Sequence, residues 1–232
     1  MRSETAGLSS TRRSLLALLA TVCVTAACAK EVEHSEGAAE KGPAARPNYA
    51  VRMDTESSDP AEFRLVEDDD GIRVQTGPAG IAYRSDDVIL SGDMHVQATF
   101  EQYGAPLGYR EAFGLFLGGI DLEGPELEYT YLLVRTTGDY MVKRRIGEIT
   151  ETLADWTAHP SVRTVEVEGD RPVNTLGIDV FSGQVHFVVN GDVVHVEAAS
   201  RVRPYGVAGV RVNHRLDVRV DRWIMQETSD QS

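Results

Sequence analysis

Residues 184–197 read QVHFVVNGDVVHVE and contain two short runs in which apolar and polar side chains alternate. The runs meet at Asn190-Gly191. Both central positions of a tight hairpin turn need a positive φ, which Asn and Gly adopt most readily, so this dipeptide predicts a β-hairpin. In the first run the odd-numbered apolar residues share one side of the strand, and we therefore expect His186 to point away from the core.

The same period of two recurs along the chain and predicts further strands. It is clear in DMHVQATFE, EAFGLFLGG, YTYLLVRTTG, NTLGIDVF, GVAGVRVN and RLDVRVDRWIM, which begin at residues 93, 111, 129, 174, 206 and 215. Hairpin turns are expected at residues 137–139 and at Ser182-Gly183. No stretch has a clear helical period, although EITETLADW, residues 148–156, is ambiguous. The pattern predicts an all-β domain, either a sandwich or a barrel.

The order of these segments is similar to that of a known group of folds. DWTAHPSV at residues 155–162 supplies a tryptophan strand. An Asn-x-Leu strand, a Gly hairpin, an aromatic strand ending in Asn-Gly and a Gly-rich strand follow it. Residues 93–225 thereby resemble concanavalin A-like lectins and glucanases, in particular laminin-G-like modules and the 3-keto-disaccharide hydrolase domains of exported bacterial proteins. The resemblance implies an antiparallel two-sheet jelly-roll sandwich that binds sugars on its concave sheet.

Sugar recognition uses aromatic faces beside planar polar side chains, and the predicted strands carry several of these. The candidates for ligand binding are Tyr131, Arg135, Lys143, Arg145 and His186. The alternative is that they are solvated side chains of the outer faces, which a sandwich needs in quantity. We expect Trp156 and Trp223 to lie in the core.

A candidate for catalysis lies in GIDLEGPELEY, residues 119–129. Asp121, Glu123 and Glu126 have the spacing of the glucanase motif E-x-D-x-x-E, in which two carboxyl groups cleave a glycosidic bond. The residue types are permuted, however, and Gly124-Pro125 interrupts the run, where Pro cannot donate a ladder hydrogen bond. The sequence therefore favours an acidic loop between strands over a catalytic strand.

The run EDDDG, residues 67–71, gathers oxygen ligands of the kind that calcium prefers. Contiguous acidic residues also initiate turns, and one short run cannot supply a full coordination shell. We predict no metal and no cofactor.

The first residues predict export. A basic segment with Arg12-Arg13 leads into an uncharged apolar run, residues 14–27, which ends in small residues and is too short to span a bilayer. Thr25-Ala26-Ala27-Cys28 resembles the lipobox of bacterial lipoproteins, which implies a lipid on Cys28. Ordinary secretion, with cleavage after Ala29, is the alternative. The paired arginines also resemble a twin-arginine export motif.

Composition divides the chain into four parts: a signal peptide at 1–27, a flexible tether at 28–48, the sandwich at 49–227 and a disordered tail at 228–232. The tether is nearly free of large apolar side chains, so it cannot offset its ordering entropy. The formal net charge is −13, which argues against nucleic acid as a partner because such binding needs clustered Lys and Arg.

These observations favour a lipid-anchored module of the bacterial cell envelope, in the periplasm or on the cell surface, that binds a glycan or an envelope protein. A glycoside-cleaving enzyme of the 3-keto-disaccharide hydrolase type is the alternative. A structural envelope lipoprotein is a third.

Overall fold

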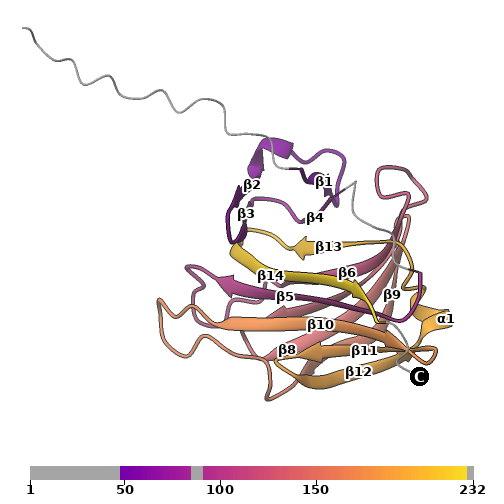
Figure 1. The fold of residues 1–232 in the computed structure, drawn as a ribbon. Helices are drawn as coiled ribbons and strands as arrows, with labels where there is room; N and C mark the ends of the chain where they lie inside the picture. Colours follow the sequence, from indigo (N-terminus) through magenta and orange to yellow (C-terminus); the bar gives the residue numbers. More distant parts are fainter. Residues whose placement is uncertain (1–47, 85–90, 229–232) are drawn as a thin grey trace, which may run out of the picture. The chain divides into compact units, whose positions relative to one another are not determined.

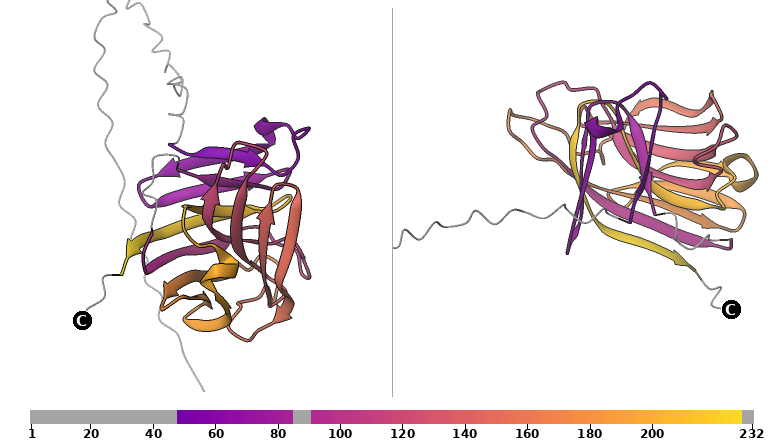
Figure 2. Two further views of the ribbon diagram at one scale, coloured as in Figure 1. Left: turned by 90° about the vertical axis from the view of Figure 1, so that its right-hand side faces the viewer. Right: turned by 90° about the horizontal axis from the view of Figure 1, so that it is seen from above.

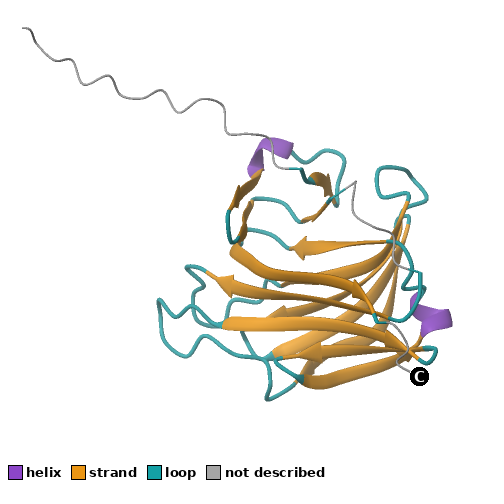
Figure 3. Ribbon diagram, in the orientation of Figure 1, coloured by secondary structure: helices purple, strands orange, loops and turns teal. Residues whose placement is uncertain are grey.

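The structure is a computed structural model that describes residues 48–84 and 91–228. The predicted signal peptide, Cys28, all but the last residue of the predicted tether and residues 229–232 of the tail lie outside the described residues. Nearly all regular structure in the described part is β, and it forms two antiparallel seven-stranded sheets (Figure 1). Within residues 48–84 and 91–228, two short helical segments interrupt the strands (Figure 3). Neither has the length and apolar character that crossing a membrane requires.

Sheet A contains strands from the first and middle parts of the domain together with β13 from its last part. In spatial order its strands are β1 (Ala50–Met53), β4 (Gly80–Tyr83), β13 (Val207–Val212), β6 (Phe113–Ile120), β7 (Glu128–Arg135), β8 (Asp139–Ile146) and β9 (Ile149–Ala158).

Sheet B lies against it and includes the last strand of the chain. In spatial order its strands are β12 (Asp192–Ala198), β11 (Gln184–Val189), β10 (Val173–Phe181), β5 (Met94–Gln102), β14 (Asp217–Glu227), β3 (Gly71–Thr76) and β2 (Phe63–Asp68). The two views of Figure 2 show β5 and β14 running side by side. The helical segments are η1 (Pro60–Glu62) before β2 and α1 (Ala199–Val202) after β12.

The main core lies between the sheets and follows the predicted alternation. In β11, Val185, Phe187 and Val189 are fully buried, whereas His186 points to the other side, as predicted. Phe100 of sheet B stacks on Phe113 of sheet A with ring centroids 5.4 Å apart. Each sheet thus buries one face of alternating apolar residues, which is the physical basis of a sandwich.

The predicted hairpin turns are present. Asn190 and Gly191 join β11 to β12 with φ values of 52° and 92°, and Ser182 and Gly183 join β10 to β11 with 51° and 74°. Asn190 has a second role, because its side chain accepts a hydrogen bond from the amide of Thr175 at 2.8 Å. The turn is therefore fixed to the neighbouring strand β10 as well as to its own hairpin.

The ambiguous segment at residues 148–156 is part of a strand, β9. This strand is an edge of sheet A and pairs only with β8, so most of its side chains are partly or fully exposed. Exposure explains the polar composition that left helix and strand undecided.

Candidate functional site

Four of the residues predicted for ligand binding lie on one surface. In the antiparallel β7–β8 pair, Tyr131 is opposite Lys143 and Tyr129 is opposite Arg145. Paired residues of antiparallel strands point to the same side of the sheet, and Arg135 joins them because it follows Tyr131 by four residues in the same strand. The alternate residues of both strands face the core between the sheets. We call the opposite surface the outer face of sheet A.

A second cluster of apolar side chains, most of them buried, lies on this outer face. We call this layer the floor of the site. Its rings are arranged in a row: Phe116 lies 5.2 Å from Tyr129, and Tyr129 lies 5.6 Å from Tyr131, between centroids. Tyr131 is 5% exposed. The buried members of the cluster are Ile81, Tyr83, Ala112, Phe116, Leu122, Leu127, Tyr129, Tyr131, Leu133 and Met141.

A network of two arginines and one carboxylate lies on this floor. Arg211 of β13 donates through Nη1 to Asp54 Oδ1 at 2.8 Å and to the hydroxyl of Tyr129 at 2.9 Å. Arg145 donates through Nη1 to the same oxygen of Asp54 at 2.9 Å. The Arg211 guanidinium also lies 4.9 Å from the centre of the Tyr131 ring, within the range of a cation–π contact.

The network fixes the protonation states of its members. Burial by itself would raise the pKa of Asp54, but the hydrogen bond and charge of Arg211, with the charge of Arg145, bring the pKa below its ordinary value of 3.8. Burial raises the pKa of the Tyr131 phenol to about 12, although the charge of Arg211 acts against that shift. At neutral pH the surface therefore combines an ionised Asp54 with a neutral Tyr131.

Arg135 and Trp156 form a second stacked pair, and the position of Trp156 differs from the one predicted. Trp156 was predicted to be a core residue, but it packs on the outer face of sheet A, with the Arg135 guanidinium 4.1 Å from the centre of its ring system. The reason is a bulge between β8 and β9, at which the pairing register shifts after Tyr140. A bulge turns a side chain out of the regular alternation, which a period-two reading cannot detect. Trp156 is only partly buried and so presents indole surface to solvent.

Beside the network the surface opens into a hollow of about 590 Å³. Asp54 and Arg145 line it together with Arg52 and the exposed residues of the following turn, Thr55 to Ser57. The outer face of sheet A therefore offers planar aromatic and guanidinium groups on a buried floor, with a polar recess at one end.

His186, the fifth residue predicted for binding, does not belong to this surface. It lies in β11 of sheet B, on the side opposite the core, with its ring 4.4 Å from that of Phe181. His186 therefore does not share a surface with the other four candidates, and its role in binding stays a prediction. Alternation within a strand predicts the direction of a side chain but not the sheet to which the strand belongs.

The acidic run Asp121, Glu123 and Glu126 forms a loop between β6 and β7, as the sequence favoured. All three side chains are exposed. The Asp121 carboxylate accepts a hydrogen bond from the amide of Glu126 at 3.1 Å, and Asp121 itself has a φ of 48°. Its carboxylate thus shapes the loop, and the strand geometry that the glucanase motif needs is not formed there.

The other acidic run, at residues 67–71, forms the tight turn between β2 and β3. Asp68 accepts hydrogen bonds from the amides of Asp70 and Gly71, both at 3.1 Å, and forms a two-fold ion pair with Arg219. Within residues 48–84 and 91–228, no group of three or more His, Cys, Asp or Glu residues is placed to hold a metal ion.

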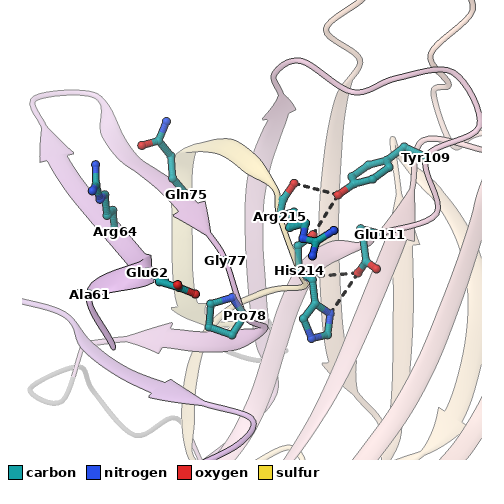
Figure 4. A pocket seen from close by; sticks show the side chains of 10 residues that line it. All are labelled: Ala61, Glu62, Arg64, Gln75, Gly77, Pro78, Tyr109, Glu111, His214 and Arg215. Atoms are coloured by element: carbon teal, nitrogen blue, oxygen red, sulfur yellow. Dashed lines mark hydrogen bonds and ion pairs between the residues drawn. The ribbon is translucent and has the colours of Figure 1, made fainter. Parts of the chain in front are cut away.

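A larger hollow lies elsewhere, at the end of the sandwich where η1 meets the β13–β14 loop (Figure 4). It is an open cleft of about 1090 Å³. The Tyr109 hydroxyl donates to the carbonyl of Arg215 at 3.0 Å, and Glu111 accepts from the amide of His214 at 3.2 Å (Figure 4). These groups support the loop itself, and no predicted site residue lines the cleft. We therefore place the candidate site on the outer face of sheet A despite the greater size of the cleft.

Two solved structures share the arrangement of strands. A carbohydrate binding module, CBM66, from Bacillus subtilis matches with a TM-score of 0.55 at 9% identity, over 76% of this chain and 95% of that chain. A GH16 protein of the Bacteroides ovatus mixed linkage glucan PUL, in complex with a G4G4G3G product, matches with a TM-score of 0.51 at 9% identity, over 78% and 96%. The shared feature is the two-sheet jelly roll. The predicted fold class is thus confirmed, while comparisons with models of protein families and with curated proteins find no match.

Two residues at the centre of the site, Asp54 and Arg211, were not among the candidates predicted from the sequence. The position of Arg211 could have been predicted, because its neighbours Val210 and Val212 are apolar. Successive side chains of a strand point to opposite sides, so Arg211 must point away from the core. The position of Asp54 could not, since it follows a short edge strand and lies 157 positions from its partner in the chain.

Proposed function

We propose that this protein is a glycan-binding module and that it binds its ligand on the outer face of sheet A. The observation that carries the proposal is the pairing of planar groups there: Arg211 with Tyr131 and Arg135 with Trp156. Aromatic faces bind the apolar faces of sugar rings, while guanidinium groups donate to hydroxyl and carboxylate oxygens in a fixed plane.

The fold supports this choice of ligand class. One structural neighbour is described as a carbohydrate binding module, and the other contains an oligosaccharide product. The buried floor adds a physical argument. Tyr131 and Arg211 are held by packing and by Asp54 before any ligand arrives, so binding costs little side-chain ordering.

We further propose that the module is exported and anchored by a lipid on Cys28, with residues 28–48 as its tether. The basic segment, the apolar run and the lipobox-like tetrapeptide support this. The sandwich at 49–227 would then be displayed in the periplasm or on the cell surface, where it meets envelope glycans.

A glycan array probed with the full chain, followed by calorimetry on the glycans that bind, tests the proposed function. Trp156→Ala should weaken binding by about 10-fold, because it removes the partly exposed stacking surface. His186→Ala is the matched control: it also removes a partly exposed ring, but from the outer face of sheet B. Thermal unfolding establishes that both variants are folded. Unchanged binding in Trp156→Ala, or an equal loss in His186→Ala, would place the ligand elsewhere.

A further inference from the structure

Among the described residues, Lys143 has no partner for its charge, and it lies beside Tyr131 in the candidate site. It lies on the outer face of sheet A and is partly exposed. The strand register places it between Tyr131 of β7 and Thr152 of β9. Within residues 48–84 and 91–228, no carboxylate or other acceptor binds its ammonium group.

The other cations that project from this face on β7, β8 and β13 are all paired. Arg135 donates through Nε to Asp139 at 2.8 Å. Arg145 and Arg211 share Asp54. The four cations on these strands thus have two carboxylates as partners, Asp139 and Asp54, and neither of the two pairs with Lys143.

On this face these three strands thus carry more positive than negative charge, whereas Glu56 and Glu148 line the recess beside them and the whole chain has a formal net charge of −13. A positively charged patch attracts small anions even when the protein as a whole is acidic. The aromatic floor beneath the patch limits the approach of water from below, which strengthens the attraction to a bound anion.

We infer that the glycan bound here is acidic, with a carboxylate or sulfate ester on a sugar residue seated against Lys143. This inference rests on the proposed function. An ammonium group offers three donors and no acceptor, and it binds an anionic oxygen more strongly than a neutral hydroxyl. Residues paired across strands have Cβ atoms about 5 Å apart, so a sugar ring lying over Tyr131 brings its acidic substituent within reach of Lys143.

The test compares glycans that differ only in charge. Calorimetry with the full chain would measure oligogalacturonates and their methyl esters, in which the carboxylate is neutralised without changing the sugar. Sulfated oligosaccharides and their desulfated counterparts form a second matched pair. We expect the acidic member of one pair to bind at least about 10-fold more tightly than its neutral form, and this preference to fall as salt is raised.

Two variants link the preference to Lys143. Lys143→Met keeps the length of the side chain but removes the charge, so it should bind both members of the pair alike. Lys143→Arg keeps the charge and should retain the preference. The carboxylate and sulfate pairs show which anionic group is recognised.

The outcomes separate this inference from the proposed function. Binding of neutral glycans without preference for either acidic form would overturn the inference and leave glycan binding in place. A charge preference that persists in Lys143→Met would also overturn it. Failure of every glycan, neutral and acidic, to bind would overturn both.

Discussion

The guanidinium of Arg211 lies 4.9 Å from the ring of Tyr131, although their strands, β13 and β7, are not neighbours. Strand β6 lies between them, and its residue opposite Arg211 is Gly114. A Cβ at Gly114 would lie 2.0 Å from the carbonyl oxygen of Leu132 in β7, so only glycine fits at this position of the strand that separates the two residues.

Removal of the Asp54 charge should destabilise the fold. Asp54→Asn leaves Arg211 buried beside Arg145 without their shared carboxylate, and breaking one side of such a pair costs about 3 kcal/mol. Urea unfolding of the full chain measures this loss. Asp68→Asn is the control, since it also breaks a two-fold pair with an arginine, but one that is exposed, and its effect should be much smaller. Equal losses in the two variants would contradict the role given to Asp54.

The contribution of Asp54 should also depend on pH. Its pKa in the folded protein is lower than the ordinary value of 3.8, so the unfolded chain takes up the proton first as pH falls. The stability that Asp54 provides is therefore complete above about pH 4 and is lost as pH falls through its folded pKa. Urea unfolding of wild type and Asp54→Asn between about pH 2.5 and 6 should give a difference in stability that becomes smaller as pH falls below about 4. A constant difference between them would mean that the carboxylate is not the source of the effect.

A methyl group at Gly209 should disturb the aromatic floor. A Cβ there would lie 2.5 Å from the Phe116 ring and 2.5 Å from the carbonyl oxygen of Ala82, closer than real contacts allow. We expect Gly209→Ala to cost about 1–3 kcal/mol, because the ring and both backbones must shift. Gly177→Ala in sheet B is the control, since its Cβ would have no neighbour closer than 3.5 Å. Denaturant unfolding compares the two, and an unaffected Gly209→Ala variant would mean that the floor is loosely packed.

Replacement of Cys28 should detach the protein from membranes. Cys28→Ala removes the residue of the proposed lipobox that would carry the lipid, so the variant has lost its proposed anchor. When cells are fractionated, we expect the wild type in the membrane fraction and the Cys28→Ala variant in the soluble fraction. Intact-mass analysis supplies the independent check: an unmodified mature N-terminus after Ala29 would favour ordinary secretion.

Local chemistry made much of the fold predictable. Asn190-Gly191 and Ser182-Gly183 mark turns because positive φ is a property of those residues themselves. The alternation in β5, β6, β10 and β11 gave the direction of each side chain, since successive residues of any strand point to opposite sides. The joint placement of Tyr131, Arg135, Lys143 and Arg145 also follows from local pairing, because β7 and β8 are joined by a short hairpin.

Only the tertiary structure decided which surface each of these side chains faces. His186 and Tyr131 both point away from the core, yet they lie on different sheets, because β11 pairs with β10 while β7 pairs with β6 and β8. A bulge between β8 and β9 places Trp156 on the outer face of sheet A and not in the core. Asp54 and Arg211 form a hydrogen bond although 157 positions separate them in the sequence. Such relationships arise from the packing of strands that are distant in sequence, and a pattern confined to one strand carries no information about its eventual neighbours.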